Sequence, residues 1–481
     1  MKALTQIWAC LFALGGAPVV GHAQSKPLWP ADVQTALQQA QLPAEALAVY
    51  IAPLDGPTSA PSFTHRSQAP VNPASLMKLV TTYAALDQLG PTFSWRTELL
   101  SDAPQPVAQG VLKGSVYVRS NGNPLWLWET AYTQLSRLRA MGIHTVTGDW
   151  VVDNSAWRLP PHDPAAFDQE PLRPYNVGPE ATTVQYQTVA LSAVPKPEQG
   201  VAQLIVEPPM GDVLWPATVP LTDAAPCHEW RQRLRLDWTN PTEVLARGGY
   251  PKGCDTQTWH LAPPQAQTQT VRVLQGLWAQ LGGRTLGQGR AARTPDNARL
   301  LLTQDSPPLA DVVRRINKFS NNLMAEQVFL TLGAQSGLEA SDTPSQARLN
   351  LAQWWQRRLP QATAPLWVNG SGLAREQRIS AQSLGQLLAL AWQGPLMPDF
   401  VASLPLAGQD GTLRRHAPAQ GAAHLKTGSL NDVMGVAGYL HRPNGQRAVF
   451  VAIVQHPQAA KARPVLNALT NWAMQGTLSK Q

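Results

Sequence analysis

The chain has 481 residues, 44% of them hydrophobic and 14% charged, which is the composition of a folded globular protein rather than a disordered one. This length is too great for one ordinary core and predicts two or three domains. The formal net charge of +7 is spread without a block of lysine or arginine, and no nucleic-acid-binding motif accompanies it, so we expect no nucleic-acid partner.

The N-terminus predicts export from the cytoplasm. Lys2 precedes an apolar run over residues 7–20, and the small residues Gly21 and Ala23 stand at the positions that a signal peptidase requires for cleavage. We therefore expect residues 1–23 to be a signal peptide and the mature protein to be periplasmic. No later stretch is apolar over the roughly 18 residues that a membrane-spanning helix needs.

Two cysteines remain once Cys10 leaves with the signal peptide. Cys227 and Cys254 in an exported chain predict one disulfide, with two free thiols as the alternative.

Apolar periodicity predicts an α/β protein that is interrupted by a β-rich segment. The N-terminal part contains a helix over 30–41, strands over 46–53 and 63–70, and a helix that begins near Pro73. Short strands separated by Gly, Pro and Asn then follow at 95–100, 111–119, 145–152, 184–193, 202–207 and 231–237. The remaining elements are helices at 271–281, 309–332, 349–358, 380–393 and 459–475, and strands at 427–441 and 446–455 joined by a turn at 443–445.

These patterns divide the chain into four segments. They are a signal peptide, 1–23, the first part of an α/β domain, 24–95, a β-rich insert that can hold two nested subdomains, 96–284, and the second part of the same domain, 285–481.

Ser75 and Lys78 form a Ser-x-x-Lys motif at the start of the helix that begins near Pro73. Residues three positions apart on a helix share one face, so the lysine amine can reach the serine hydroxyl. A lysine in a water-poor site loses basicity and can accept the serine proton, which creates a nucleophile. On this stretch alone, the more common alternative is a helix with an N-terminal serine and an exposed lysine.

Two further motifs follow in the C-terminal half. Ser320-Asn321-Asn322 precedes a helical stretch, and Lys426-Thr427-Gly428 opens a strand. Ser-x-x-Lys, Ser-x-Asn and Lys-Thr-Gly in this order are the signature of β-lactamases and penicillin-binding proteins.

The first two motifs supply the groups that acyl transfer needs. Ser75 attacks a carbonyl carbon and Lys78 takes its proton. Ser320 relays a proton between the lysine side and the leaving amine. Asn322 holds the peptide carbonyl of the substrate and the Lys78 side chain.

The third motif supplies the groups that hold the substrate. Lys426 and Thr427 bind a C-terminal carboxylate, and Gly428 lets the substrate backbone lie along the strand edge. The backbone N–H groups of Ser75 and Ser429 form the oxyanion hole.

The chain resembles the penicillin-binding protein 4 type of D-alanyl-D-alanine carboxypeptidase/endopeptidase, the class C low-molecular-mass penicillin-binding proteins. The three motifs carry the resemblance, together with the long separation of Ser75 from Ser320 and the stretches 148–155, 369–375 and 404–413. The sequence departs from the family at Asn369, where Asp is usual, and in a divergent insert rich in tryptophan.

The resemblance implies a serine β-lactamase/DD-peptidase-like fold, in which helices flank an antiparallel sheet and a large β-rich insert interrupts the chain. It implies peptidoglycan stem peptides as substrates, β-lactams as covalent inhibitors, and no cofactor or metal. It also implies that Asp153 and Arg375 bind the ammonium and carboxylate of the diaminopimelate side chain. The alternative for Asp153 is an aspartate that forms a turn, and the alternative for Arg375 is a surface ion pair.

Two other functions compete with a DD-peptidase. A β-lactamase uses the same acylation but needs a deacylating glutamate motif, and we find no convincing Glu-x-x-Leu-Asn stretch. A non-catalytic sensor or scaffold needs no intact motifs. The sequence leaves the oligomeric state and the balance of carboxypeptidase to endopeptidase activity open.

Overall fold

The structure of the chain is a computed structural model that describes residues 29–55, 62–104, 109–223, 225–416 and 418–475. The expected signal peptide, residues 1–23, lies outside the described residues. None of the helices in the described ranges is both long and apolar enough to span a membrane.

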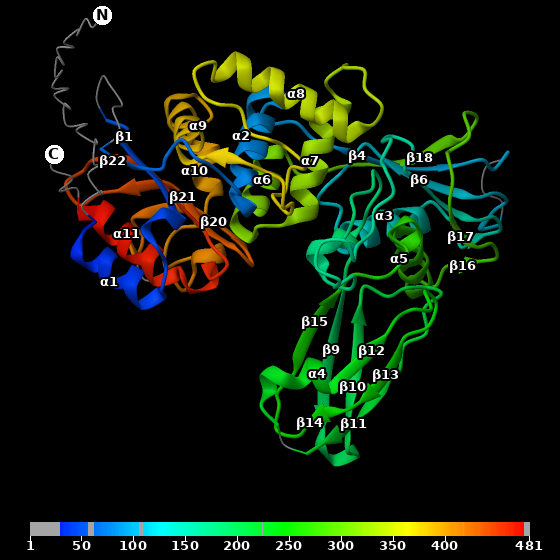
Figure 1. Cartoon of the computed structure of the whole chain (residues 1–481). Coiled ribbons are helices and arrows are strands. Elements are labelled where there is room, and N and C mark those ends of the chain that lie inside the picture. The colour runs from blue at the N-terminus through cyan, green and yellow to red at the C-terminus, as the bar shows by residue number, and fades with distance from the viewer. Residues whose placement is uncertain (1–28, 56–61, 105–108, 224, 417, 476–481) are drawn as a thin grey trace, which may run out of the picture.

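A five-stranded antiparallel sheet, with strand order β2-β1-β22-β21-β20, forms the centre of one half of the molecule (Figure 1). Its strands are β1 (Leu47–Pro53), β2 (Phe63–His65), β20 (Ala423–Leu430), β21 (Val433–His441) and β22 (Arg447–Gln455). The single strand predicted over 427–441 is therefore wrong. Asn431 and Asp432 turn the chain, so that β20 and β21 pair as a hairpin.

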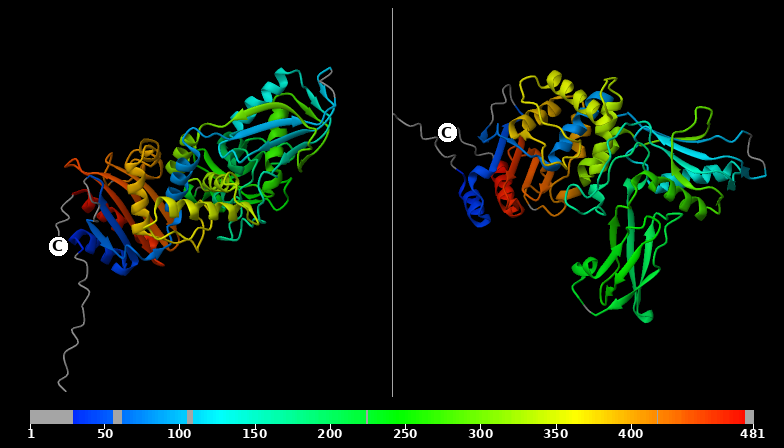
Figure 2. Two further views of the ribbon diagram at one scale, coloured as in Figure 1. Left: turned by 90° about the horizontal axis from the view of Figure 1, so that it is seen from above. Right: turned by 45° about the vertical axis from the view of Figure 1, so that its right-hand side comes forward.

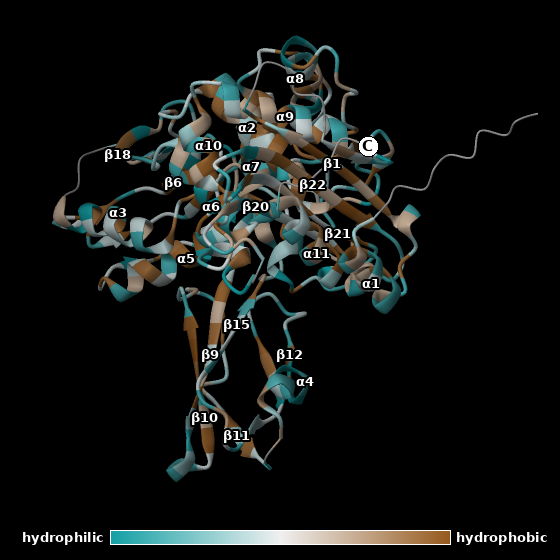
Figure 3. Ribbon diagram, turned by 90° about the vertical axis from the view of Figure 1, so that its left-hand side faces the viewer, coloured by the Kyte–Doolittle hydropathy of each residue, from teal (hydrophilic) through white to brown (hydrophobic). Residues whose placement is uncertain are grey.

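Both faces of this sheet are buried, and the alternation of side chains along β1 shows it. Leu47, Val49 and Ile51 pack with the layer of α1 (Ala31–Ala40) and α11 (Arg463–Gln475). Ala48 and Tyr50 pack on the opposite face, against the layer of helices described next. A strand that is buried on both faces reads as a continuous apolar run, and β1 and β22 are accordingly mostly brown in Figure 3.

Six helices form the layer on the second face of the sheet, and the largest hydrophobic core of the protein lies among them and against the sheet. They are α2 (Met77–Leu89), α6 (Leu309–Phe319), α7 (Asn322–Ala334), α8 (Thr343–Arg358), α9 (Ala381–Gln393) and α10 (Met397–Ser403). A short strand pair, β3 (Pro70–Val71) with β19 (Ile379–Ser380), borders this layer. The helical stretch predicted over 309–332 is two helices, because the chain turns at Ser320 and Asn321.

The β-rich insert begins with a second five-stranded sheet, of order β17-β8-β6-β4-β18. Its strands are β4 (Arg96–Ser101), β6 (Val116–Ser120), β8 (Trp150–Asp153), β17 (Gly289–Ala291) and β18 (Arg299–Asp305), with β5 (Val111–Leu112), β7 (Thr145–Val146) and β16 (Arg284–Thr285) in a small sheet beside it. Helices α3 (Trp128–Ala140), which the sequence did not predict, and α5 (Ala266–Gln280) pack in its core. β17 pairs with β8 and β18 pairs with β4, so this sheet includes residues past 284, as far as Asp305.

A third sheet forms an elongated lobe that projects away from the rest of the molecule (Figures 1 and 2). It has the order β14-β11-β10-β9-β15 and lies beside the pair β12–β13. The bounds are β9 (Val189–Lys196), β10 (Val201–Glu207), β11 (Thr218–Thr222), β12 (Leu234–Asp237), β13 (Leu245–Gly248), β14 (Tyr250–Pro251), β15 (Gln257–Leu261) and a short helix α4 (Trp230–Arg233). Cys227 and Cys254 form the predicted disulfide, which joins the segment before α4 to the segment after β14.

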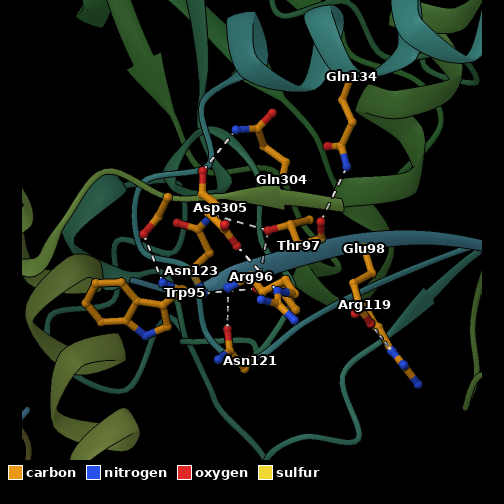
Figure 4. A network of polar contacts seen from close by, with 12 residues as sticks. Trp95, Arg96, Thr97, Glu98, Arg119, Asn121, Asn123, Gln134, Gln304 and Asp305 are labelled. Carbon is orange, nitrogen blue, oxygen red and sulfur yellow. Dashed lines mark hydrogen bonds and ion pairs between the residues drawn. The ribbon is translucent and has the colours of Figure 1, made fainter. Parts of the chain in front are cut away.

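The insert is joined to the helical layer by two strands that lie side by side, β4 and β18 (Figure 4). Arg96 and Asp305 pair at the ends of these strands, and Trp95 and Ser306 continue the pairing by exchanging hydrogen bonds. An antiparallel sheet flanked by helices and interrupted by a β-rich insert confirms the predicted fold class.

Candidate active site

Ser75 lies in a 3₁₀ turn, Ala74–Leu76, that leads directly into α2. Pro73 already has helical dihedral angles and occupies the position before this turn, as expected for a residue that has no N–H to satisfy. The turn places the serine one helical turn from Lys78, and Lys78 Nζ lies 3.0 Å from Ser75 Oγ.

Lys78 is completely buried, and oxygen atoms surround its amine. The amine donates to Asn322 Oδ1 at 2.7 Å and to the backbone carbonyl of Ser371. Burial lowers the pKa of Lys78 well below its usual value and the charge of Lys426 lowers it further, while Glu326 acts in the opposite direction. This environment favours the neutral amine that a general base requires.

The Ser-x-Asn motif forms the corner between α6 and α7. Ser320 ends α6 in the left-handed region, with φ 58°. Asn321 caps α7, because its Oδ1 accepts from the backbone N–H of Met324 at 2.9 Å. Asn322 is the first residue of α7, and its Nδ2 donates to the backbone carbonyl of Tyr175, in the insert, at 3.2 Å.

The Lys-Thr-Gly motif lies on β20. Lys426 is fully buried and donates to Ser320 Oγ at 2.8 Å. Burial lowers the pKa of Lys426 to about 7. Thr427 Oγ1 donates to Thr412 Oγ1 at 3.0 Å, which brings the 404–413 stretch to the same edge, and Ser429 is exposed two residues further along the strand.

Two glycines permit the backbone of Ser75 to lie close to its neighbours. A Cβ atom on Gly428 would lie 2.7 Å from the carbonyl oxygen of Pro73, so β20 could not approach the turn that carries Ser75. Gly372, with φ +88°, packs against Ala74 from the other side, and a Cβ there would lie 3.1 Å from Ser75 Cα. These contacts fix where the serine backbone lies between β20 and the 369–375 stretch.

The three motifs therefore meet at one place, as two serine–lysine pairs. Ser75 is paired with Lys78, and Ser320 is paired with Lys426. Asn322 contacts the first lysine and lies two residues after the second serine, as the first residue of α7. A hydroxyl next to a buried amine can become a nucleophile, and a second hydroxyl next to a second amine can carry a proton.

Sequence reasoning missed two groups that support this site. Ser371 lies within the 369–375 stretch, and its carbonyl accepts from Lys78. Its hydroxyl donates to Glu326 Oε1 at 2.8 Å, and burial raises the pKa of Glu326. Glu326 is four positions after Asn322 on α7, so helical spacing could have placed it on the same face.

Asp153 and Arg375 lie in different surroundings. Asp153 is buried at the end of β8, where its carboxylate accepts from the backbone N–H groups of Ser155, at 2.9 Å, and Thr294, at 2.7 Å. Burial opposes the charged form, but these hydrogen bonds lower its pKa overall. This geometry is that of a turn-forming aspartate.

Arg375 instead reaches the insert. Its guanidinium is exposed, lies 4.8 Å from the ring centroid of Phe167 and donates to the carbonyl of Phe167 at 3.0 Å. None of the hydrogen bonds or ion pairs among the described residues joins Arg375 to Asp153.

The sequence matches the D-Ala-D-Ala carboxypeptidase 3 (S13) family over residues 30–475. It is 26% identical to a D-alanyl-D-alanine carboxypeptidase of Actinomadura sp. over 90% of this chain and 83% of that protein. It is 23% identical to the D-alanyl-D-alanine carboxypeptidase DacB of Haemophilus influenzae over 79% of this chain and 80% of that protein.

The fold is also similar to that of a solved structure. The crystal structure of penicillin binding protein 4 from Haemophilus influenzae superposes with a TM-score of 0.74 at 20% identity, over 92% of this chain and 99% of that one. The chain therefore belongs to the D-Ala-D-Ala carboxypeptidase 3 (S13) family, serine-type carboxypeptidases of the penicillin-binding protein 4 type that the sequence resembles.

Proposed function

We propose that the protein is a periplasmic, penicillin-sensitive DD-peptidase that works through an acyl-enzyme on Ser75. It removes the terminal D-Ala from peptidoglycan stem peptides and cleaves D-Ala–diaminopimelate cross-links. The observation that carries this proposal is the 3.0 Å contact between Ser75 Oγ and the amine of Lys78, which is buried beside a second lysine.

Acylation begins when Lys78 Nζ takes the proton of Ser75 as Oγ bonds to the substrate carbonyl carbon. The oxyanion that forms is held by the N–H groups of Ser75 and Ser429; losing one such donor typically costs roughly 3–4 kcal/mol of transition-state stabilisation. The carbon–nitrogen bond then breaks, and Ser320 delivers a proton to the leaving amine. Water hydrolyses the ester and restores Ser75.

The C-terminal carboxylate of the substrate binds Lys426 and Thr427 at the edge of β20. A carboxylate close to Lys426 favours the charged form of an amine whose pKa is about 7 in the free protein. Asn322 Nδ2, which donates to the Tyr175 carbonyl in the free protein, exchanges this partner for the peptide carbonyl of the substrate.

The catalytic domain is proposed to comprise the parts of the chain before β4 and after β18. The insert between them supplies a wall of the cleft through Tyr175 and the Phe167 contact with Arg375.

Labelling with a fluorescent penicillin tests acylation directly. The wild-type protein should carry one adduct, on Ser75, and Ser75→Ala should carry none while keeping its far-UV circular dichroism. An adduct on another residue would refute the assignment. Rapid β-lactam turnover would indicate a β-lactamase instead, and absence of labelling would indicate a non-catalytic protein. Incubation with muropeptides and product analysis then separates the two peptidase activities, and fractionation of cells tests the location.

The side-chain pocket for diaminopimelate is proposed to use Arg375 for the carboxylate. Asp153 was the predicted partner for the ammonium, but a different carboxylate lies close to Arg375 in the sequence of contacts. Phe167 accepts a hydrogen bond from Arg375, and the next residue is the half-buried Asp168. Asp168 accepts from the Tyr175 hydroxyl at 2.7 Å and so lies on the segment that touches Asn322.

Asp168→Asn and Asp153→Asn form a matched pair for this pocket. If Asp168 binds the ammonium, its variant should cleave diaminopimelate peptides about ten-fold more slowly, which is the loss of one charge-assisted interaction. Asp153→Asn should reduce thermal stability without a selective loss of this substrate. Penicillin acylation is the control, because simple penicillins lack the side chain. The opposite pattern would restore Asp153 to the role.

A further inference from the structure

A cavity of about 780 Å³ lies within the insert, on the side that faces α7. Residues between 154 and 187 form one wall, and residues 236–239 and 262–267 form the other. Seven prolines, Trp157 and Trp238 line it together with aliphatic side chains. Its size falls within the roughly 300–1,000 Å³ of small-molecule sites, and an apolar lining with a few polar groups is typical of them. We call it the insert cavity.

Gln187 is the most unusual polar group in the insert cavity. Its side chain is 1% exposed, and neither Nε2 nor Oε1 has a hydrogen-bond partner among the described residues. Trp238 Nε1 is likewise buried and lacks a partner within the described ranges. Buried polar groups in folded proteins are almost always hydrogen-bonded, so an amide with both its donor and its acceptor free requires an explanation.

The backbone that presents Gln187 is strained. Gln185, Tyr186 and Gln187 have φ values of 53°, 55° and 52°, so three consecutive residues other than glycine occupy the left-handed region. Such residues are individually unfavourable, and runs of them are rarer still. Strain of this kind persists where the surroundings enforce it and is concentrated at ligand sites.

One wall of the insert cavity also touches the catalytic helix α7. The carbonyl of Glu180, which lines the cavity, accepts from Gln327 Nε2 at 3.3 Å. Tyr175, which belongs to the same segment but does not line the cavity, accepts from Asn322 Nδ2 at 3.2 Å through its carbonyl. Glu180 lines the cavity, and burial raises the pKa of its carboxyl group to about 7. A carboxyl group that is partly protonated near neutral pH can donate to a ligand hydroxyl as well as accept from it.

We propose that the insert cavity binds an N-acetylated sugar of the glycan strand that carries the substrate peptides. In the free protein both atoms of the Gln187 amide are covered, so its side chain must turn into the cavity to meet a ligand. An acetamido group has one donor and one acceptor, which then complement the two amide atoms. The apolar face of a sugar ring suits the indole and proline rings of the walls. This inference rests on the proposed function, because it takes its ligand from the polymer that the cleft cleaves. It gives the insert a part in substrate recognition.

Calorimetric titration of the Ser75→Ala protein with N,N′-diacetylchitobiose tests the inference, and cellobiose, which has the same rings without acetamido groups, is the matched ligand control. Diacetylchitobiose should bind in a saturable manner, and cellobiose at least about ten-fold more weakly. Gln187→Leu, made in the same protein, keeps the side-chain size and should weaken diacetylchitobiose binding by about the same factor. Its melting temperature should stay the same or rise, since a buried unpaired amide has been removed.

Gln269→Leu is the matched control variant. Gln269 is also 1% exposed with both amide atoms unpartnered within the described ranges, but it does not line the insert cavity. This variant should bind the sugar normally. Absence of sugar binding, equal binding of cellobiose, or equal losses in Gln187→Leu and Gln269→Leu would overturn the inference. Penicillin acylation, measured in the protein with Ser75 intact, tests the proposed function separately. If the protein is labelled by penicillin but does not bind the sugar, the proposed function stands and only this inference fails.

Discussion

Replacing Gly372 with alanine should displace the nucleophile without touching a reacting atom. Gly372 packs against the backbone on which Ser75 lies, and an added Cβ would meet the Ala74 carbonyl, with its carbon only 2.6 Å away. Real Cβ atoms essentially never approach within 3.0 Å, and Gly372 faces backbone rather than the end of a flexible side chain. The turn that carries Ser75 must therefore retreat by about 1 Å once both the carbon and its oxygen are cleared.

A displacement of this size has a predictable effect on rate. A misplacement of about 1 Å at a reacting group costs on the order of a hundred-fold, which corresponds to about 2.7 kcal/mol in the barrier. The left-handed φ of +88° adds about 1 kcal/mol of strain in the folded state. Gly372→Ala should thus fold with reduced stability and be acylated by penicillin about a hundred-fold more slowly.

The second-order acylation rate, measured by stopped flow or timed gel labelling, is the assay. Gly337→Ala is the control, because Gly337 also has a left-handed φ, of +68°, but an added Cβ would meet nothing within 4 Å. It should lose similar stability and keep its acylation rate. If folded Gly372→Ala is acylated within about three-fold of wild type, the contact does not position Ser75, and the reasoning is wrong.

Three further predictions follow from the buried lysines and the disulfide. Lys78→Arg should keep the positive charge yet lose penicillin acylation, because a guanidinium does not deprotonate; near-normal labelling would contradict the general-base role. The acylation rate should rise with pH as Lys78 loses its proton, whereas affinity for carboxylate ligands should fall above pH about 7 as Lys426 becomes neutral; a flat profile of both quantities from pH 5 to 9 would contradict these assignments. Removing the bridge by the double change Cys227→Ser and Cys254→Ser should cost on the order of 3 kcal/mol of stability in urea unfolding and leave acylation unchanged.

The sequence predicted the parts of the fold that local patterns determine. The helices near residues 31, 381 and 463 and the apolar strands β1 and β22 follow from periodicity that agrees with their burial. The turn between β20 and β21 was missed, because apolar residues continue on both sides of it. Helix α3 was missed because its apolar face is narrow, with Ala131 and Leu135 among the few buried residues.

The candidate site was predictable where chemistry fixes residue type and spacing. The three motifs named Ser75, Lys78, Ser320 and Lys426, and the structure brings them together. Contacts made by backbone carbonyls could not be foreseen, because any residue can provide them. The contact of Tyr175 with Asn322 depends on how the insert folds against α7, and no local pattern encodes that arrangement.

The paired strands β4 and β18 allow the insert to be exchanged as one unit. Arg96 and Asp305 face each other across the ladder, so the chain leaves the catalytic half and returns to it at the same place (Figure 4). Segments whose ends lie together can be gained, lost or exchanged without moving the two ends of the host chain, and a two-residue hairpin could close the gap. Genetic replacement of the whole segment would then leave the Trp95–Ser306 hydrogen bonds in place. It would also remove Trp157 and Ala181 from the core of the helical layer, so the replacement must cover that core.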